Sequence, residues 1–396
     1  MLAVALGGMA LFFVSWALLH YGSYTDNAIT DLPVYERYGR AIADGEVPYR
    51  DFRPEYPPLA LPAFALPALD DGESGYRRVF EALMAACGAL AVGLVALTLA
   101  AVRAPPFRIG AAVAAVALAP LALGNVLLSR FDLWPALLVV AALLALVSSR
   151  EQLGSGLLGL GVAAKIYPGV LVPLAVAWMW RRHGRREALV CLGISTATVA
   201  ACFLPFLVVA PEGVAASLGR QLSRPLQIES LGAALLVAVD HLGGPTVEMD
   251  SGRGSQNVAG AAGTVVGVVA SLVQAAALVW IWVRFARGPA DTERLLRFAA
   301  AALVAFVALG KVVSPQFLIW LIPVVPLVAG RRGLAASALL GAALVATHGW
   351  FPDRYWDYAL TFDTGVSWLV LVRDLLLVGV LLALLARPPG REPARS

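Results

Sequence analysis

Charged residues are scarce in this sequence. Only 14% of its 396 residues are Asp, Glu, Lys or Arg, whereas 60% are hydrophobic and the mean hydropathy is +0.78. Soluble globular domains carry about 25% charged residues and about 45–50% apolar ones. A water-soluble protein is therefore excluded, and the composition is that of an integral membrane protein.

Cysteine is rare as well. Its three copies, Cys87, Cys191 and Cys202, lie inside apolar runs, and none forms a CxxC pair. Neither a disulfide framework nor a zinc site is therefore expected. The sequence also lacks the HExxH, P-loop, GxSxG and GxGxxG motifs in a suitable context, so it offers no basis for a zincin, a nucleotide-binding fold or a serine hydrolase. We expect no metal ion and no cofactor.

Long apolar runs are abundant. Twelve runs rich in Leu, Ala and Val occur, most of them near the length that about 30 Å of hydrocarbon requires of a helix. They cover residues 2–20, 79–102, 109–124, 133–148, 153–164, 166–180, 187–210, 258–283, 295–310, 315–329, 333–350 and 366–386. The pattern predicts an all-α polytopic membrane protein with about 11–13 transmembrane helices. Runs 153–164 and 166–180 are short and separated only by Lys165, so they also fit a re-entrant pair.

The basic residues orient these helices. With a cytoplasmic N-terminus, the cytoplasmic connections and tail carry 16 Arg and five acidic residues, a net charge of +11. The other side carries 14 basic and 21 acidic residues, a net charge of −7. Because short cytoplasmic loops are enriched in Lys and Arg, we place the long loops 21–78 and 211–257 outside. We expect a single transmembrane domain over residues 1–386 and a disordered cytoplasmic tail over 387–396.

Three further segments have patterns of their own. Residues 32–43 place apolar side chains at helical spacing with charges between them, which predicts an amphipathic helix on the membrane face. Residues 57–69 contain four prolines and are apolar but too short to span, so we expect them to dip into the outer leaflet. The basic segment 181–186 is expected to anchor the cytoplasmic side to anionic lipid.

The first outer loop alternates carboxylates, arginines and tyrosines around prolines. It reads YTDNAITDLPVY from Tyr24 and VPYRDFRPEYPP from Val47. A carboxylate at the boundary of water and membrane, partly desolvated by apolar neighbours, is suited to act as a general base. Asp31 has that setting. The alternative is that Asp31 caps the predicted helix, since Asp is a favoured N-cap residue.

Lys165 and Lys311 are conspicuous because the other 28 basic residues are Arg. Each ends a predicted span at its outer boundary, shortly before a proline. An ionisable group at membrane depth is costly and is by default a functional candidate. For Lys165, phosphate binding and snorkelling to the interface are both open. For Lys311, pairing with Asp132 or Glu229 is the alternative to a functional role.

More polar residues lie near the outer ends of the spans. Arg130 and Asp132 are two residues apart, and we expect them to form an ion pair with each other, with a ligand clamp as the alternative. Arg224, just before a proline, is a candidate for a phosphate contact. His241 and His348 are expected to be hydrogen-bonded structural residues.

Aromatic residues also mark the outer boundaries. Four tryptophans gather there, and we expect most of them to belong to the interfacial aromatic belt, with sugar stacking as the alternative for one: Trp320, Trp350, Trp356 and Trp368.

Four segments, in order, carry a resemblance to a known family. Asp31-Leu32-x-Val34-Tyr35 is followed by Tyr56-Pro57-Pro58-Leu59, then by the glycine-rich segment 159–168 ending in Lys-Ile-Tyr-Pro, then by residues 227–231, Gln-Ile-Glu-Ser-Leu. Together they resemble glycosyltransferase family 87, multispan enzymes of the GT-C superfamily. Those enzymes are polyprenyl-phosphate-mannose-dependent mannosyltransferases. The last segment is similar to the family's short Asn-Gln-Ser loop, with only Ser230 retained.

The chain departs from the family pattern at two places. Residues 124–125 and 129–135 stand where the family commonly has Gly-Gln-x-Asn. Residues 311–320 stand where it has Ser-Pro followed by a pair of histidines, and those histidines are absent. The departures leave the identity of the donor open and do not touch the chemistry centred on Asp31.

The resemblance implies an inverting glycosyltransferase that moves a hexose, mannose in the first instance, from a polyprenyl-phosphate donor to an extracytoplasmic glycolipid or polysaccharide. It implies that Asp31 is the catalytic base. The residues expected to bind the donor phosphate are Lys165, Arg53, Arg224 and Lys311. The residues expected to bind substrate are Asp26, Tyr35, Glu55, Tyr56, Arg130, Asp132, Gln227, Ser230 and Gln316.

The implied setting follows from the same resemblance. Loops 21–78 and 211–257 would form the active-site face of a GT-C-like bundle in the plasma membrane. The isoprenoid tail of the donor is soluble only in lipid, so the site needs cations for a phosphate at the membrane face rather than a nucleotide-binding fold. The expected partners are the lipid-linked donor, the glycolipid or glycan acceptor and membrane lipid, with no nucleic acid, and the chain is expected to be a monomer.

Two other functions are open. An arabinofuranosyltransferase would use the same kind of donor with a different sugar. A transporter or flippase of polyprenyl-linked lipids is disfavoured, because no inverted repeat is visible and the charged residues gather at one face instead of the membrane midplane.

Overall fold

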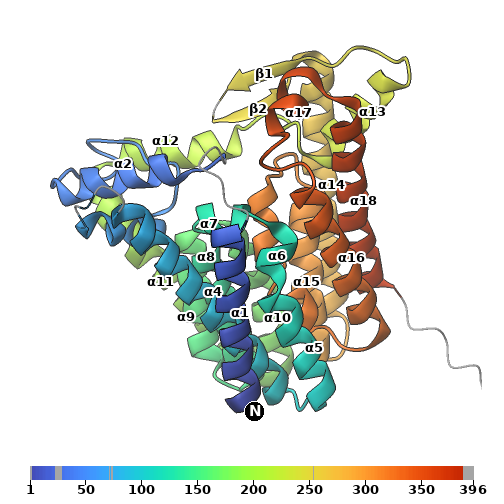
Figure 1. Cartoon of the computed structure of the whole chain (residues 1–396). Helices are drawn as coiled ribbons and strands as arrows, with labels where there is room; N and C mark the ends of the chain where they lie inside the picture. The colour runs from blue at the N-terminus through green and yellow to red at the C-terminus, as the bar shows by residue number, and fades with distance from the viewer. Residues whose placement is uncertain (1, 23–28, 71, 73–74, 253, 387–396) are drawn as a thin grey trace, which may run out of the picture.

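The computed structural model is a bundle of helices with a layer of short elements at one end (Figure 1). The structure describes residues 2–22, 29–70, 72, 75–252 and 254–386. The short elements α2, α12, α13, α17, β1 and β2 all lie toward the end opposite the first residues of α1, and we call that end the outer end. The predicted tail over residues 387–396 lies outside the described residues.

Eleven of the twelve predicted apolar runs form α-helices of the bundle, most of them within a few residues of the predicted bounds; the run 166–180 begins with a 3₁₀ segment, and its α-helix starts at Val172. These helices are α1 (Leu2–Gly22), α4 (Gly75–Ala101), α5 (Pro106–Ala117) continued by α6 (Ala119–Leu123), α8 (Leu133–Val147), α9 (Glu151–Ala164), α10 (Val172–His183), α11 (Arg185–Val209), α14 (Gly260–Ala286), α15 (Thr292–Ala308), α16 (Gly330–His348) and α18 (Thr364–Leu385).

The twelfth run is not an α-helix. Residues 315–329 form two 3₁₀ segments, η4 (Pro315–Trp320) and η5 (Val325–Leu327), instead of the continuous helix that the hydropathy predicts. Pro323 and Pro326 explain the difference, because proline lacks a backbone N–H and clashes with the preceding helical turn. The segment still runs through the core, since every residue from Leu318 to Val328 is buried.

Five of the bundle helices are long and apolar enough to cross a membrane, namely α1, α4, α11, α14 and α18. The protein is thus a polytopic helical membrane protein, as the composition predicts. The five differ in their surroundings: 67% of the most apolar window of α4 is buried in the protein, but only 6% of that of α11 and 17% of that of α14. Helices α11 and α14 therefore present most of their apolar surface to lipid.

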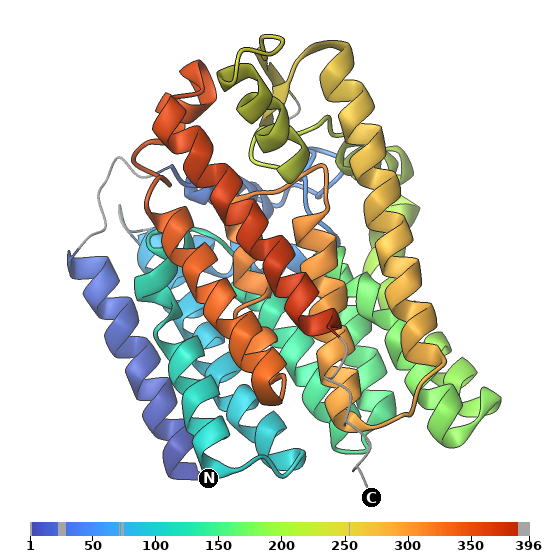
Figure 2. The ribbon, with the colours of Figure 1, turned by 90° about the vertical axis from the view of Figure 1, so that its right-hand side faces the viewer.

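The turns between α4 and α5, α8 and α9, α10 and α11, and α14 and α15 lie at the end of the bundle opposite the outer end (Figures 1 and 2). These turns hold the arginine-rich connections that the charge distribution assigns to the cytoplasm. The described parts of the long loops 21–78 and 211–257 lie together at the outer end. The ends of the bundle at which the connections lie thus agree with the two groups of loops that the charge distribution separates.

The outer layer begins with helix α2 (Leu32–Ala43), whose bounds match the predicted amphipathic helix. Residues 57–69, predicted as a short dipping segment, form η1 (Pro58–Ala60), α3 (Leu61–Ala65) and η2 (Pro67–Leu69). The second loop and the region before the last helix supply the remainder: α12 (Pro211–Leu222), α13 (Leu231–His241), the antiparallel strands β1 (Met249–Gly252) and β2 (Ser255–Val258), and α17 (Tyr355–Thr361).

The two outer loops pack directly on each other. Helix α12 lies against residues 49–55, where Ser217 Oγ donates a hydrogen bond to the carbonyl of Pro54 at 2.9 Å. Gln221 Nε2 donates to the carbonyl of Glu55 at 3.0 Å. Gly213 comes so close to the carbonyl of Tyr49 that a Cβ atom there would lie 1.9 Å from its oxygen. The outer end is therefore a packed layer in which each loop supports the other.

Three helices end near the outer end of the bundle, and a glycine or a proline follows each of them. The chain turns at Gly124, whose φ is +76°, and then forms the short helix α7 (Val126–Ser129). Helix α9 ends before Lys165, whose backbone is extended, and a 3₁₀ segment η3 (Tyr167–Leu171) with Pro168 follows. Helix α15 ends at Ala308, shortly before Pro315. These interruptions bring polar side chains from separate helices into the space beneath the outer layer.

Candidate active site

Asp31 lies at the start of α2 but does not cap it. Its side chain makes no capping hydrogen bond, and Thr30 Oγ1 instead accepts the hydrogen bond from the N–H of Leu32 at 3.1 Å. The carboxylate accepts a hydrogen bond from Tyr35 Oη at 3.2 Å and forms an ion pair with Arg130. Its side chain is 32% exposed, whereas that of Arg130 is 5% exposed. The carboxylate is therefore fixed by side chains of the protein interior, and part of it remains accessible to a ligand.

The predicted ion pair between Arg130 and Asp132 is wrong. Arg130 pairs with Asp31, and Asp132 pairs with Lys165, whose Nζ lies 2.6 Å from Asp132 Oδ1. The same oxygen accepts a hydrogen bond from Trp320 Nε1 at 2.5 Å. The reason is tertiary: the break between α7 and α8 places each charge next to an oppositely charged side chain from another segment. Two adjacent ion pairs result, one of them fully buried at Asp132.

Lys165 is enclosed by aromatic rings. Its Nζ lies 4.7 Å from the ring centroid of Phe131, 5.1 Å from Trp320, 5.8 Å from Phe317 and 6.0 Å from Tyr56. An ammonium within about 6 Å of an aromatic face is attracted by the ring quadrupole. Its side chain is 13% exposed, so the snorkelling interpretation is wrong: the chain points inward to Asp132 and not out to the interface.

Trp320 is a structural part of this aromatic enclosure. Its ring stacks on Tyr167 at 4.0 Å with an interplanar angle of 2°, and on Phe317 at 4.1 Å. Both Trp320 and Trp350 are buried, so the expectation that they belong to the interfacial belt is wrong. Trp356 and Trp368 are 49% and 38% exposed, which fits that expectation. Hydropathy alone did not separate the two kinds, because all four lie near span ends.

A second aromatic cluster packs around Tyr35, the hydrogen-bond donor to Asp31. Tyr35 stacks on Phe64 at 4.5 Å, and Tyr56 meets Phe131 edge to face at 5.0 Å. Burial raises the pKa of both tyrosine hydroxyls well above the ordinary value, with the carboxylate of Asp31 adding to the effect. Tyr35 is therefore a permanent hydrogen-bond donor to Asp31. The Tyr-Pro-Pro segment supplies this cluster by fixing the backbone beside Tyr56.

The other side of the site is the turn at residues 227–230. The N–H of Gln227 donates to the carbonyl of Lys311 at 2.9 Å, and the Gln227 side-chain amide donates to the carboxylate of Glu229. Ser230 is the N-cap of α13, since its hydroxyl accepts from the N–H of Ala233 and donates to the carbonyl of Gln227 at 2.7 Å. The Ser230 hydroxyl is fully buried and used in holding the turn.

Glu229 joins this turn electrostatically to the rest of the site. Burial raises the pKa of Glu229 to about 7, while the positive charges of Arg373, Arg224 and Arg130 act to lower it. Burial likewise raises the pKa of the Tyr355 hydroxyl, and the charges of Glu229, Arg130, Arg224 and Asp31 all reach it. Arg130 thus lies within electrostatic range of both carboxyl groups, and the residues of both outer loops form one polar cluster.

The remaining predicted residues lie around this cluster. Glu55 forms an ion pair with Arg220 at 3.3 Å, and Lys311 Nζ donates to the carbonyl of Leu222 at 3.3 Å. Arg53 is exposed, and Gln316 is half-buried in η4. Asp26 lies outside the described residues.

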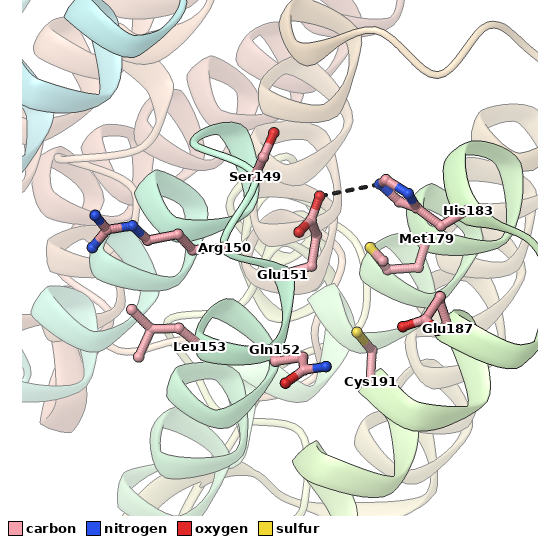
Figure 3. A pocket seen from close by; sticks show the side chains of 9 residues that line it. All are labelled: Ser149, Arg150, Glu151, Gln152, Leu153, Met179, His183, Glu187 and Cys191. Atoms are coloured by element: carbon pink, nitrogen blue, oxygen red, sulfur yellow. Dashed lines mark hydrogen bonds and ion pairs between the residues drawn. The ribbon is translucent and has the colours of Figure 1, made fainter.

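A pocket of about 470 Å³ lies at the opposite end of the bundle, between the α8–α9 turn, α10 and α11 (Figure 3). Its lining includes Glu151 and His183, whose Oε1 and Nε2 atoms are 3.2 Å apart. The pocket shares no residue with the polar cluster at the outer end. Among the described residues, no group of three or more His, Cys, Asp or Glu side chains is placed to hold a metal ion.

Comparison with known families decides the assignment. The family model of glycosyltransferase family 87 matches residues 55–315 of this chain. The chain belongs to glycosyltransferase family 87. The match confirms the family predicted from the sequence, and its range includes the Tyr-Pro-Pro segment, the glycine-rich segment 159–168 and the turn at 227–230. The segment containing Asp31 precedes the matched residues.

The chain is also similar to two solved structures. These are crystal structures of ArnT from Cupriavidus metallidurans, one bound to undecaprenyl phosphate and one in the apo state. They show 14% and 15% sequence identity and TM-scores of 0.49 and 0.46, and each comparison covers 97% of this chain and 76% of the other. No curated protein matches the sequence.

In this member of glycosyltransferase family 87, four residues in or beside the site are not among those that the sequence predicts for it: Trp320, Glu229, Arg373 and Asp374. Trp320 was predicted as an interfacial residue, and Glu229 only as a possible partner of Lys311. Arg373 and Asp374 are a charged pair inside the last apolar run, and both are buried. The signal for this pair was present, because charged residues inside an apolar span are costly.

Proposed function

We propose that this protein is an inverting glycosyltransferase that transfers mannose from a polyprenyl-phosphate donor to a glycolipid or glycan acceptor outside the cytoplasm. Family membership supports the sugar transfer. The observation that carries the assignment of the site is the Asp31 carboxylate, which is partly exposed yet fixed by Tyr35 and Arg130. A general base needs both access to the acceptor and a fixed position.

The reaction follows from this geometry. The acceptor hydroxyl oxygen attacks the anomeric carbon of the donor from the face opposite the phosphate, and its proton passes to the Asp31 carboxylate. The bond between the anomeric carbon and the phosphate oxygen breaks, and the electron pair stays on the polyprenyl phosphate. The transferred sugar is inverted at that carbon, and the leaving group carries additional negative charge.

Cations near Asp31 are suited to stabilise that charge. Arg224 is our first candidate, because its Nε is buried without a hydrogen-bond partner within the part of the chain that the structure describes. Lys165 is the second candidate. Its ammonium is buried next to Asp132, so the donor phosphate and the Asp132 carboxylate would both interact with its positive charge. Arg53 and Lys311 are candidates for outer contacts. Charge-assisted hydrogen bonds to phosphate are among the strongest that side chains form.

The lipid-linked donor explains why the cluster lies where it does. The polar residues come from the start of α2, the break between α7 and α8 and the turn before α13, elements that lie toward the outer end (Figure 1). A polyprenyl chain would remain in the membrane while its phosphate reaches these residues. The charge distribution of the sequence supports an extracytoplasmic site in the plasma membrane.

The test is a transfer assay with the purified protein. Given radiolabelled polyprenyl-phosphate-mannose and a glycolipid acceptor in detergent, the wild type should release polyprenyl phosphate and label the acceptor with inverted configuration. Movement of intact donor between leaflets of proteoliposomes, without release of polyprenyl phosphate, would show a transporter instead. Labelling from a polyprenyl-phosphate-arabinofuranose donor alone would replace mannose as the sugar.

Asp31→Asn should abolish transfer while donor binding survives. Removal of a general base costs about 10²- to 10⁴-fold in rate. Asn retains the shape of the side chain but removes the charge that pairs with the buried Arg130, so thermal unfolding of the variant is measured beside its activity. Asp26→Asn is the matched control from the same loop and should reduce the rate less. An active Asp31→Asn variant beside an inactive Asp26→Asn variant would move the base to Asp26.

A further inference from the structure

Helix α18 carries a buried charged pair in the middle of its apolar sequence. Arg373 is 0% exposed and Asp374 is 1% exposed, and Arg373 Nε lies 2.8 Å from Asp374 Oδ1. A charge at membrane depth is rare and expensive, so it is retained where it serves a purpose. The pair accounts for only part of the guanidinium, which has further N–H groups to place.

The guanidinium of Arg373 reaches the outer turn. Its Nη2 donates a hydrogen bond to the carbonyl oxygen of Glu229 at 2.7 Å. The preceding carbonyl, that of Ile228, accepts a hydrogen bond from Tyr358 Oη at 2.6 Å. Two consecutive peptide groups of the turn are therefore held by buried side chains from the C-terminal part of the chain. The side chains of Gln227 and Glu229 are fixed as a consequence.

The turn thus presents its polar side chains toward the arginines of the site. The Glu229 carboxylate accepts a hydrogen bond from Gln227 and lies within electrostatic range of Arg130 and Arg224. Within the described chain, the buried atoms Gln227 Oε1 and Arg224 Nε have no hydrogen-bond partner. Buried polar atoms are nearly always hydrogen-bonded in native proteins, so this acceptor and this donor are suited to a hydroxyl-rich ligand.

We propose that Glu229 is a further substrate-contacting residue, which accepts a hydrogen bond from a hydroxyl of the transferred sugar, and that Arg373 is the residue that positions it. This inference rests on the proposed function, because it takes the sugar of the donor as the ligand. Asp31 then approaches the reacting carbon from the first loop, while Glu229 holds the ring from the second. Arg373 acts through the turn and does not touch the substrate.

The charge of Glu229 depends on several neighbours. Arg373 faces it from α18, Arg224 from the second loop and Arg130 from the α7–α8 break. Asp374 pairs with Arg373, and Tyr355 and Tyr358 lie on α17. Because the positive charge of Arg373 lowers the pKa of Glu229, its removal should raise that pKa further. Tyr358 also hydrogen-bonds to this turn but carries no charge. Its variant therefore distinguishes the effect of holding the turn in place from the effect of the positive charge of Arg373.

The experiment compares Glu229→Gln, Arg373→Gln, Arg373→Lys and Tyr358→Phe in the full-length protein in detergent. Two quantities are measured across the pH range around 7: the infrared band of the Glu229 carboxyl group, and the affinity for a mannosyl phosphate carrying a short prenyl chain. The infrared band is identified by its loss in Glu229→Gln. Thermal unfolding of each variant reports whether it is folded.

We expect the wild-type band to titrate with a midpoint near 7. The midpoint should rise in Arg373→Gln, return toward the wild-type value in Arg373→Lys, and stay unchanged in Tyr358→Phe. Glu229→Gln should weaken binding of the probe about ten- to hundredfold. Tyr358→Phe should weaken it less, and only through the looser turn.

Two results would overturn the inference. An unmoved midpoint in folded Arg373→Gln would remove the positioning role of Arg373. Unchanged probe affinity in Glu229→Gln, or no binding by the wild type, would remove the contact with the sugar. The proposed function fails separately, when the wild type releases no polyprenyl phosphate although it binds the probe.

Discussion

Lys165 and Asp132 depend on each other inside the protein. The sequence alone predicts that Lys165 can be truncated without harm, as a side chain at the end of a span. Its ion pair with the fully buried Asp132 makes that interpretation wrong. A buried charge left without its partner is strongly destabilising, whereas replacing both partners together costs much less.

Lys165→Ala should therefore lower the stability of the protein by about 3–5 kcal/mol. The double variant Lys165→Met with Asp132→Asn should recover most of that loss, because neither residue then carries a charge. Thermal unfolding in detergent measures both. Equal stability of Lys165→Ala and wild type would mean that the ion pair contributes nothing to the folded state.

The double variant also isolates the role of Lys165 in donor binding. If its ammonium contacts the donor phosphate, the stable double variant should bind the donor about one to two orders of magnitude more weakly, the value of one charge-assisted contact. Arg224→Ala is the comparison, since Arg224 is our first candidate for that contact. Full affinity in the double variant would leave the phosphate to Arg224.

The buried Glu229 predicts a dependence of stability on pH. Burial raises its pKa to about 7 in the folded protein from an ordinary value of 4.5. Between these two pH values the unfolded chain releases the proton while the folded protein keeps it, so stability falls as pH rises. The loss is complete above the folded pKa and amounts to about 3 kcal/mol at most.

Glu229→Gln removes that proton equilibrium. The melting temperature of the variant should change less than that of the wild type as the pH rises from about 4.5 to about 7. Other groups titrate equally in both proteins, so the difference between the two curves is the quantity to measure. Parallel curves would show that burial does not shift the Glu229 carboxyl group.

Helix α12 makes a close backbone contact that tests the packing of the outer layer. Gly213 lies against the Tyr49 carbonyl, whereas Gly219 on the same helix has no atom within 4 Å of its virtual Cβ. Gly213→Ala should push α12 away from the first outer loop and reduce transfer. Gly219→Ala should leave activity unchanged and stabilise α12 by up to about 1 kcal/mol, because Ala favours helix over Gly.

Hydrogen exchange of residues 49–55 measures this packing directly. Faster exchange is expected in Gly213→Ala and wild-type exchange in Gly219→Ala. If both variants behave alike, the close contact with Tyr49 is not what holds the first loop in place.

The helices themselves could be predicted from local sequence, but their contacts could not. The amphipathic helix 32–43 and eleven apolar runs follow from each segment's own pattern of side chains. The 3₁₀ structure of 315–329 was also foreseeable from Pro323 and Pro326. In contrast, the pairing of Arg130 with Asp31 joins residues 99 positions apart, and no periodicity records such a partner.

The same limit applies to the candidate site. Asp31, Arg130, Asp132 and Lys165 were chosen from the sequence, and the structure brings them together. The sequence does not single out Arg373, because its hydrogen-bond acceptor is the carbonyl of Glu229, in a turn that is distant in the chain. The candidate ligand-binding residues Asp31 and Lys165 lie in recognisable sequence motifs. The only sequence signal for Arg373, which holds a turn in place, is a charge inside an apolar span.

For the whole molecule, the two ends of the bundle predict which residues face the outside of the cell. Glu46 and Ser251 are exposed in the outer loops, and Arg186 is exposed in the first turn of α11, at the opposite end of the bundle. Glu46→Cys and Ser251→Cys should react with an impermeant thiol reagent in intact cells, and Arg186→Cys should not. These positions are preferable to the adjacent Gly45 and to Gly184, whose positive φ values would strain a cysteine.

Lysis of the cells provides the control. Arg186→Cys should then react, because the reagent reaches the cytoplasmic side. Labelling of Arg186→Cys from outside would reverse the orientation and place Asp31 toward the cytoplasm. The site geometry would stand, but the acceptor would have to be a cytoplasmic molecule.

The two lipid-facing helices, α11 and α14, have 25 and 27 residues. At 1.5 Å per residue they are about 37 Å and about 40 Å long, which exceeds the roughly 30 Å of a typical hydrocarbon core. Such an excess is absorbed by tilting or by local thickening of the bilayer. Because α11 leads directly into α12 and α14 follows β2, these two helices flank the second outer loop, and a change in acyl-chain length acts on both ends of that loop. Membrane thickness should therefore affect how the second outer loop is aligned with the first, and with it the two parts of the site that these loops carry.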